Sequence, residues 1–369
     1  MKRIFAMILV LAICFSFAAC GADQTGDRDQ SQPPQQSIST ETEETQNNTT
    51  TATNDPSDMT ETTTYTEGNF TYTVLEDQLE AEEYYVEITK YTGAENAVSI
   101  PSHIDGMVVT HIGEGAFENC TTIKRIEFGI TLVSIDGNAF KGCINLEEVA
   151  QNKEVVDTNS YSPDRIVYHG QIAWIGPSAF ENCTAIKRVD FNVIDFIDDS
   201  AFKGCTSLKE LQFSVHAIGP SAFENCTAMK KAYLGSLVDI VDDSAFKGCT
   251  SLEEVSTGMS SIKAIGPSAF ENCTSLNYMG FLYTETIDEG AFRGCTSLED
   301  ICFGITSNKS IGSYAFYGCT SLKDVIISPT IESVGDYAFY GCTSLEEATV
   351  FDNTELGTDV FGNCPNLKK

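Results

Sequence analysis

The chain has few basic residues and few histidines. Of its 369 residues, 22 are Lys or Arg, 53 are Asp or Glu and four are His, which gives a formal net charge of −31. Nucleic acids and anionic membrane surfaces select for Lys and Arg, so this composition argues against both as partners. The histidines share no spacing, and the sequence contains neither an HExxH motif nor a nucleophile elbow. The sequence therefore predicts a protein that is not an enzyme and carries no cofactor.

Long apolar runs are also scarce. The longest, residues 4–17, is too short to span a bilayer, and it follows Lys2 and Arg3. A basic start and a short apolar run are typical of a signal peptide, and the small residues before Cys20 resemble a bacterial lipobox. We therefore expect residues 1–19 to be a lipoprotein signal peptide. The lipidated Cys20 would anchor an extracytoplasmic, surface-exposed chain to the bacterial membrane. The alternative is an ordinary secretory signal in which Cys20 is incidental.

The segment after Cys20 is poor in apolar side chains. Residues 21–67 contain 13 Thr and ten acidic residues but a single basic one, Arg28. Such a composition cannot bury enough apolar surface to offset the entropy lost on ordering. We expect residues 20–68 to be a disordered tether rich in Thr and Glu, which holds the following part away from the membrane.

The rest of the chain is built on one recurring motif, Ala-Phe-x-x-Cys. A fixed period in the low twenties is typical of a solenoid. Successive cysteines lie 21 to 24 residues apart, except for the 40-residue step from Cys143 to Cys183. The Phe/Cys pairs are 117/120, 140/143, 180/183, 202/205, 223/226, 246/249, 270/273, 292/295, 316/319 and 339/342, with a degenerate copy at 361/364. We predict a β-rich solenoid of about 11 turns.

Within a turn, the apolar pattern predicts one short strand. Leu208, Leu211 and Phe213 alternate with polar residues, and Ile218-Gly219 then reads as a corner. Phe223 and the cysteine that follows would point into the core and form ladders along the stack. Each turn must stack on a neighbour to bury its apolar face.

A second period of two turns is superimposed on the first. The residue after Phe alternates in sign, which would place opposite charges next to each other on adjacent turns and stabilise the stack. The residues are Glu118, Lys141, Glu181, Lys203, Glu224, Lys247, Glu271 and Arg293.

These motifs resemble the BspA-type leucine-rich-repeat proteins of bacterial surfaces. The resemblance rests on the repeated Ile-Gly-x-x-Ala-Phe-x-x-Cys-x-x-Leu pattern over residues 84–369 and on the lead-in from Tyr91 to Gly106. It implies a leucine-rich-repeat superhelix with one short parallel strand per repeat and a role in adhesion or ligand capture. It carries over no catalytic residues. We expect N-terminal β capping turns at 69–112 and the solenoid at 113–369, with an irregular insert at 150–170.

The repeat cysteines have three possible roles: buried thiols, disulfides or zinc ligands. No Cys-x-x-Cys pair is present, which argues against zinc and leads us to predict no metal site. Cysteine is often buried even when free, so near-identical inward positions favour buried thiols. Disulfides between some adjacent turns remain the alternative.

Aromatic clusters are the candidate binding residues. The ninth and tenth repeats replace the charge pattern with tyrosines, and tyrosine is enriched in recognition surfaces. The first cluster is Tyr314, Tyr317, Tyr337 and Tyr340; the second comprises Tyr278, Phe281, Leu282 and Tyr283. The alternative for both is that the rings stack only for stability.

Two functions are compatible with these observations. The first is a non-catalytic, lipid-anchored surface protein that binds an extracellular protein or glycan. The second is a structural or envelope-assembly protein that contacts the cell wall or other copies, for example through the turn ending at Lys369, for which the sequence shows no cap.

Overall fold

The computed structural model describes residues 63–76, 84–151, 171–191, 193–257, 262–281, 284–303 and 308–368. The chain divides into Met1–Met59 and a compact unit, Thr60–Lys369. The predicted signal peptide, Cys20 and the tether up to residue 62 lie outside the described residues. All structural statements below concern the compact unit.

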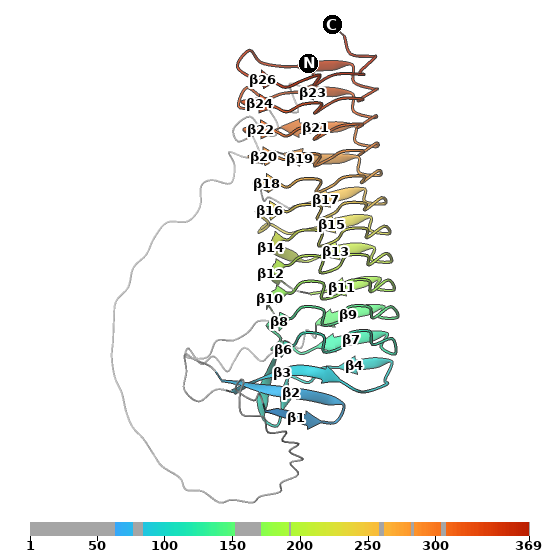
Figure 1. The fold of residues 1–369 in the computed structure, drawn as a ribbon, viewed down its shortest axis with the longest axis vertical. Coiled ribbons are helices and arrows are strands. Elements are labelled where there is room, and N and C mark those ends of the chain that lie inside the picture. Colours follow the sequence, from blue (N-terminus) through green and yellow to red (C-terminus); the bar gives the residue numbers. More distant parts are fainter. Residues whose placement is uncertain are drawn as a thin grey trace, which may run out of the picture. The chain divides into compact units, whose positions relative to one another are not determined.

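The compact unit is a β-solenoid of about ten turns built on two ladders of short strands. In the turn that contains Cys226, β13 (Glu210–Gln212) belongs to one ladder and β14 (Ser214–Ile218) to the other. Each pairs in parallel with its equivalent in the next turn, β15 (Lys231–Tyr233) and β16 (Ile240–Val241). Figure 1 shows the two ladders side by side, turn upon turn. No helix occurs in the described ranges, and the predicted solenoid is confirmed.

The first ladder is a 15-stranded sheet. Its other strands are β1 (Thr64–Glu67), β2 (Phe70–Glu76), β3 (Tyr84–Tyr91), β5 (His103–Ile104), β6 (Met107–Ile112), β8 (Ser134–Ile135), β10 (Gln171–Ile175), β12 (Val193–Ile197), β18 (Ala264–Ile265), β20 (Thr286–Ile287), β22 (Ser310–Ile311), β24 (Ser333–Val334) and β26 (Glu355–Leu356).

The second ladder consists of a four-stranded and a seven-stranded sheet. Its other strands are β4 (Ala97–Ser99), β7 (Arg125–Phe128), β9 (Glu148–Gln151), β11 (Arg188–Asp190), β17 (Glu254–Ser256), β19 (Tyr278–Phe281), β21 (Asp300–Phe303), β23 (Asp324–Ile326) and β25 (Glu347–Thr349).

The expected single strand per repeat is wrong, because a typical turn has two. Ile218-Gly219 does not follow the first strand as a corner; it closes the second strand, β14. The buried residues of β14 are Val215 and Ile218, which are three apart and therefore lack the period of two that marks a strand in sequence. Backbone pairing with the neighbouring turns makes this segment a strand.

Antiparallel strands precede the repeats. β1 pairs with β2 and β2 with β3, whereas β3 pairs in parallel with β6. Tyr91 of β3 stacks on Phe117, the first repeat Phe, with ring centroids 4.9 Å apart, and Phe70 of β2 contacts Tyr91 in turn. The aromatic interior thus begins within residues 69–112. β1 lies inside the range predicted as tether, which ends too late: strand structure starts at Thr64.

The long step between Cys143 and Cys183 leaves both ladders continuous. β9 includes the first two residues of the predicted insert, and residues 152–170 lie outside the described residues. β9 pairs directly with β11, and Phe140 stacks on Phe180 at 5.1 Å.

The core is a stack of phenylalanine rings lined by cysteines. The repeat Phe rings follow one another at centroid distances of 4.7 to 5.5 Å. The 11 repeat cysteines are free thiols; nine are buried, and Cys120 and Cys364 are half-buried. The prediction of buried thiols is therefore confirmed, and the alternative of disulfides between adjacent turns is not what the structure contains.

Candidate binding surface

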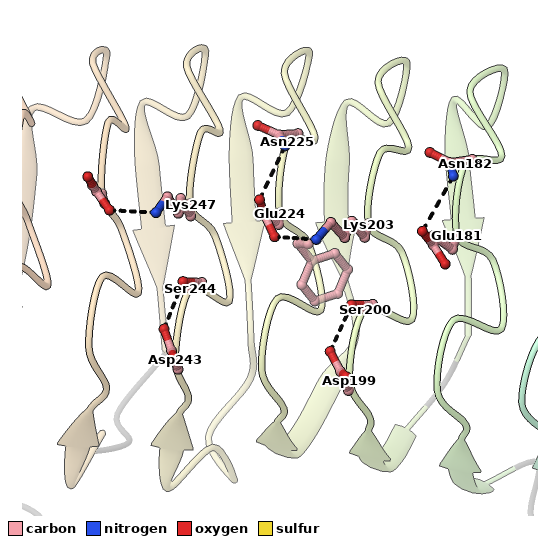
Figure 2. A network of polar contacts seen from close by, with 12 residues as sticks. Glu181, Asn182, Asp199, Ser200, Lys203, Glu224, Asn225, Asp243, Ser244 and Lys247 are labelled. Carbon is pink, nitrogen blue, oxygen red and sulfur yellow. Dashed lines mark hydrogen bonds and ion pairs between the residues drawn. The ribbon is translucent and has the colours of Figure 1, made fainter.

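The side chain after each repeat Phe, here called the post-Phe position, forms a column along the solenoid. In its middle part, a lysine of one turn pairs with a glutamate of the next. Lys141–Glu181, Lys203–Glu224 and Lys247–Glu271 each have an Nζ–Oε2 distance of 2.8 Å. Figure 2 shows Lys203 reaching Glu224. The predicted alternation of charge is therefore a ladder of inter-turn ion pairs.

The protonation equilibria of this column agree with the pairing. Burial alone would raise the pKa of Glu181. The hydrogen bonds from Lys141 and Ser178 outweigh it, and the pKa is lowered. The hydrogen bond to Glu224 raises the pKa of Lys203. Both shifts favour the charged forms of these two residues, as expected for members of ion pairs.

From Cys120 to Cys295, the residue before each repeat Cys alternates between asparagine and glycine. The sequence analysis missed the steric consequence of this alternation. Asn182 and Gly204 both have a left-handed backbone, with φ of 60° and 74°. The Asn182 amide donates from Nδ2 to Glu181, 3.4 Å away, and its Oδ1 lies 2.6 Å from where a Cβ on Gly204 would stand. Figure 2 shows this amide beside Glu181. The same overlap recurs at Gly142, Gly248 and Gly294. The signal was present in the sequence as the alternation of Asn-Cys and Gly-Cys.

The column changes character at Arg293. Its guanidinium carbon lies 5.3 Å from the centroid of the Tyr317 ring. Tyr317 stacks on Tyr340 at 5.3 Å, with 8° between the ring planes. Tyr314 stacks on Tyr337, also at 5.3 Å, and the two stacks touch through Tyr314–Tyr317 and Tyr337–Tyr340. The predicted tyrosines thus lie together and half-buried; we call them the tyrosine quartet.

Two members of the quartet occupy a strained position. Tyr314 and Tyr337 have φ of 57° and 58°, in the left-handed region, where a bulky residue is an outlier. The same position, two residues before each repeat Phe, is here called the αL position. In the other turns it holds smaller residues: Gly115, Asn138, Ser178, Ser200, Ser221, Ser244, Ser268, Gly290 and Asp359. Aligning the turns would have revealed the exception.

The second predicted cluster lies only partly within the described residues. Tyr278 lies on β19 with 56% of its surface exposed, in register with Glu254 and Asp300 of the adjacent strands. Phe281 ends the same strand, and Leu282 and Tyr283 lie outside the described residues.

The sequence analysis did not find an exposed row of apolar side chains, because it did not find the second strand of each turn, which carries them. Trp174, Phe196, Ala217 and Ile240 are in register on four consecutive strands of the first ladder. Phe196 and Ile240 are 55% and 45% exposed. Trp174 donates its indole N–H to Asp198 at 3.1 Å.

The part of the chain that the structure describes contains many carboxylates and thiols. It contains no group of three or more His, Cys, Asp or Glu arranged to hold a metal ion. The carboxylates of Asp198 and Asp199 accept hydrogen bonds from their own turn, as do Asp242 and Asp243. None of the described residues forms a helix long and apolar enough to cross a membrane.

Several solved structures of bacterial proteins are similar to this chain. A leucine-rich cell surface protein from Faecalibacterium prausnitzii is 20% identical, covering 78% of this chain and 94% of its own, with a TM-score of 0.42. A leucine-rich-repeat protein from Bacteroides ovatus is 22% identical, with coverages of 82% and 93% and a TM-score of 0.33. The pneumococcal vaccine antigen PcpA is 16% identical, with coverages of 83% and 80% and a TM-score of 0.40. No curated protein matches the chain.

The repeats themselves identify the family. The profile of the BspA type leucine-rich-repeat region matches in six copies, over residues 92–164, 158–253 and 242–368. These ranges include nearly all of the two strand ladders and the whole phenylalanine stack. The chain therefore belongs to the BspA-type leucine-rich-repeat family.

Proposed function

We propose that this protein is a non-catalytic, lipid-anchored bacterial surface protein that binds an extracellular protein or glycan through the tyrosine quartet. BspA-type leucine-rich-repeat proteins are typically bacterial surface proteins, which supports the location. The observation that carries the binding site is the placement of Tyr314 and Tyr337 in a left-handed backbone.

The fold alone does not explain those two tyrosines. Holding an L-residue in this conformation costs about 1–2 kcal/mol, and an aromatic pair returns about 0.5–1.5 kcal/mol. Serine occupies the same position in five other turns of the same solenoid. Bulky residues held in a sparsely populated backbone conformation cluster at functional positions. Tyrosine also offers a large contact area with a polar tip, which suits recognition.

The site is tested with the full chain against matrix proteins, bacterial surfaces and glycans at physiological salt. The informative variant continues the regular repeat: Tyr314→Ser and Tyr337→Ser restore the common αL residue, and Tyr317→Glu with Tyr340→Lys extends the ion-pair column above Arg293. We expect saturable binding to be lost while the thermal midpoint is retained. The control variant Phe196→Ser/Tyr278→Ser removes exposed aromatics elsewhere and should bind normally.

Two outcomes would contradict this site. Binding that survives the four substitutions, or is lost in the control, places recognition on another surface. If nothing in the panel binds and light scattering shows mass rising with concentration, the structural alternative replaces the binding function.

The anchor is tested separately. The proposal assigns membrane attachment to a lipid on Cys20, with residues 20–62 as the tether. Cys20→Ala should move the chain from the membrane fraction to the soluble fraction, because a signal peptide cut without lipidation leaves no acyl chain. Unchanged membrane retention of that variant would contradict lipidation.

A further inference from the structure

The stack Arg293–Tyr317–Tyr340 ends at a missing side chain. The next residue in the post-Phe column is Gly362, which carries nothing to cover the far face of Tyr340. Gly362 does not adopt the left-handed backbone that makes glycine necessary at other positions of the turn. The three atoms nearest to a Cβ at Gly362 are those of the Asp359 carboxyl group, at 2.5–2.6 Å, so this flexible side chain would have to move aside. The column therefore lacks a side chain at this turn, and we call the space above the Tyr340 ring, beside the Asp359 carboxyl group, the vacancy.

The other end of the same stack shows what a ring face here accepts. Arg293 lies one turn before Tyr317 in the column and holds its guanidinium against that ring, 5.3 Å from the centroid. A cation over a tyrosine face is attracted by the ring quadrupole, and arginine does this most often. The vacancy lies one turn after Tyr340, just as Arg293 lies one turn before Tyr317. The two places are therefore at opposite ends of the stack of tyrosine rings.

A carboxylate lies beside the vacancy. Asp359 occupies the αL position of the same turn and is exposed. Its two carboxylate oxygens lie 2.5 and 2.6 Å from where a Cβ of Gly362 would stand. In other turns the αL residue contacts the post-Phe residue three positions on, as in Tyr337–Tyr340 at 5.8 Å and the Ser178–Glu181 hydrogen bond. A group filling the vacancy would therefore contact Asp359 in the same way.

We propose that the vacancy above Tyr340 binds the guanidinium of an arginine side chain from the partner protein, stacked on the Tyr340 ring and paired with Asp359. This inference rests on the proposed function and names the chemistry its site recognises. Guanidinium fits better than ammonium because it is planar, stacks on aromatic faces and pairs with a carboxylate through two parallel N–H bonds. The net charge of −31 favours approach of a basic segment.

The test uses the full chain with ring-¹³C-labelled tyrosine and the peptide acetyl-Gly-Arg-Gly-amide, followed by NMR titration. The matched peptide replaces arginine with citrulline, which keeps the shape and removes the charge. We expect the Tyr340 ring signals to shift and the arginine peptide to bind about tenfold more tightly than the citrulline peptide, because both the ring and the carboxylate act on the charge.

Three variants locate the binding. Asp359→Asn keeps a residue that fits the αL position, as Asn138 does in another turn, and should weaken binding of the arginine peptide about threefold. Gly362→Arg places a guanidinium in the vacancy within the chain and should abolish the Tyr340 response. Asp352→Asn removes an exposed carboxylate of the same region and should change nothing.

Equal binding of the arginine and citrulline peptides, or full binding by Asp359→Asn, would overturn the inference. So would a glycan that shifts Tyr340 when the arginine peptide does not. If partner binding is lost on replacing the quartet while the arginine peptide fails to bind, the proposed function stands and this inference falls. If the partner still binds after the quartet is replaced, the proposed site falls, whatever the peptide does.

Discussion

The Sγ of Cys205 lies 3.2 Å from the carbonyl oxygen of Phe180, one turn back along the solenoid. The same carbonyl accepts the backbone N–H of Cys183 in its own turn, at 3.1 Å, so both of its lone pairs are used. The contact recurs from Cys143 to Cys364 at 3.0–3.3 Å. The cysteine thiols therefore link successive turns by donating hydrogen bonds to these carbonyl oxygens.

The first prediction concerns alkylation of these thiols. The thiolate attacks the methylene carbon of iodoacetamide and displaces iodide, and burial both blocks access and raises the pKa of Cys205. With the native protein at pH 8, we expect Cys120 and Cys364 to be the first repeat cysteines modified, since both are half-buried. Mass spectrometry of tryptic peptides gives the readout, and protein in guanidinium chloride is the control. Equal labelling of Cys205, or a peptide pair joined by a disulfide, would contradict the thiol ladder.

The second prediction is a loss of stability at alkaline pH. Burial raises the pKa of Cys249 from 9.0 to about 12. Below pH 9 both states hold this proton. Between pH 9 and 12 the unfolded chain has lost it and the folded chain keeps it, so the free energy of unfolding falls as pH rises. Each such thiol contributes about 1.4 kcal/mol per pH unit.

The variant Cys249→Ser isolates one member of the ladder. A serine hydroxyl does not titrate in this range, so the free energy of urea unfolding should fall between pH 9.5 and 10.5 with a slope shallower by about 1.4 kcal/mol per pH unit. Cys364→Ser, at a half-buried position, should change the slope less. A slope that Cys249→Ser leaves unchanged would show that other groups control alkaline unfolding.

Much of the interior could be predicted because it repeats. Phe180 and Cys183 recur at one spacing, and identical positions in stacked turns must lie above one another. The second strand could not be predicted in the same way, because Val215 and Ile218 follow no strand period and pairing with neighbouring turns defines the segment.

The candidate site was likewise predictable from the sequence only in part. Tyr317 and Tyr340 hold equivalent positions in adjacent turns, so their contact follows from the repeat. The left-handed backbone of Tyr314 depends on the path of the turn, which the spacing alone does not reveal. The partners of Asp359 at the vacant position likewise depend on the three-dimensional stack.

The third prediction concerns the ion-pair column. Lys203→Glu would put a third carboxylate between Glu181 and Glu224, whereas Lys203→Met removes the pair without adding repulsion. We expect a loss of about 0.5–1 kcal/mol for Met and about 1–2 kcal/mol for Glu in the free energy of unfolding at low salt. In 1 M NaCl the difference between the two variants should shrink, because salt screens exposed charges. A salt-independent difference would point to packing as the cause.

The fourth prediction separates backbone strain from the contact between Asn182 and Gly204. Gly204→Ala forces a Cβ residue into a left-handed backbone and also brings that Cβ to 2.6 Å from the Asn182 Oδ1. Gly318→Ala is the matched control, since Gly318 has nearly the same φ, 71°, but nothing within 4 Å of the new Cβ. We expect about 1–2 kcal/mol of destabilisation at Gly318 from strain alone and about 1 kcal/mol more at Gly204.

Adding Asn182→Gly should recover the excess at Gly204, because it recreates the Gly-over-Gly arrangement of Gly318 and Gly341. Equal losses at the two glycines in urea unfolding would show that the Asn182 side chain moves aside freely, and that the alternation of Asn and Gly has no steric role.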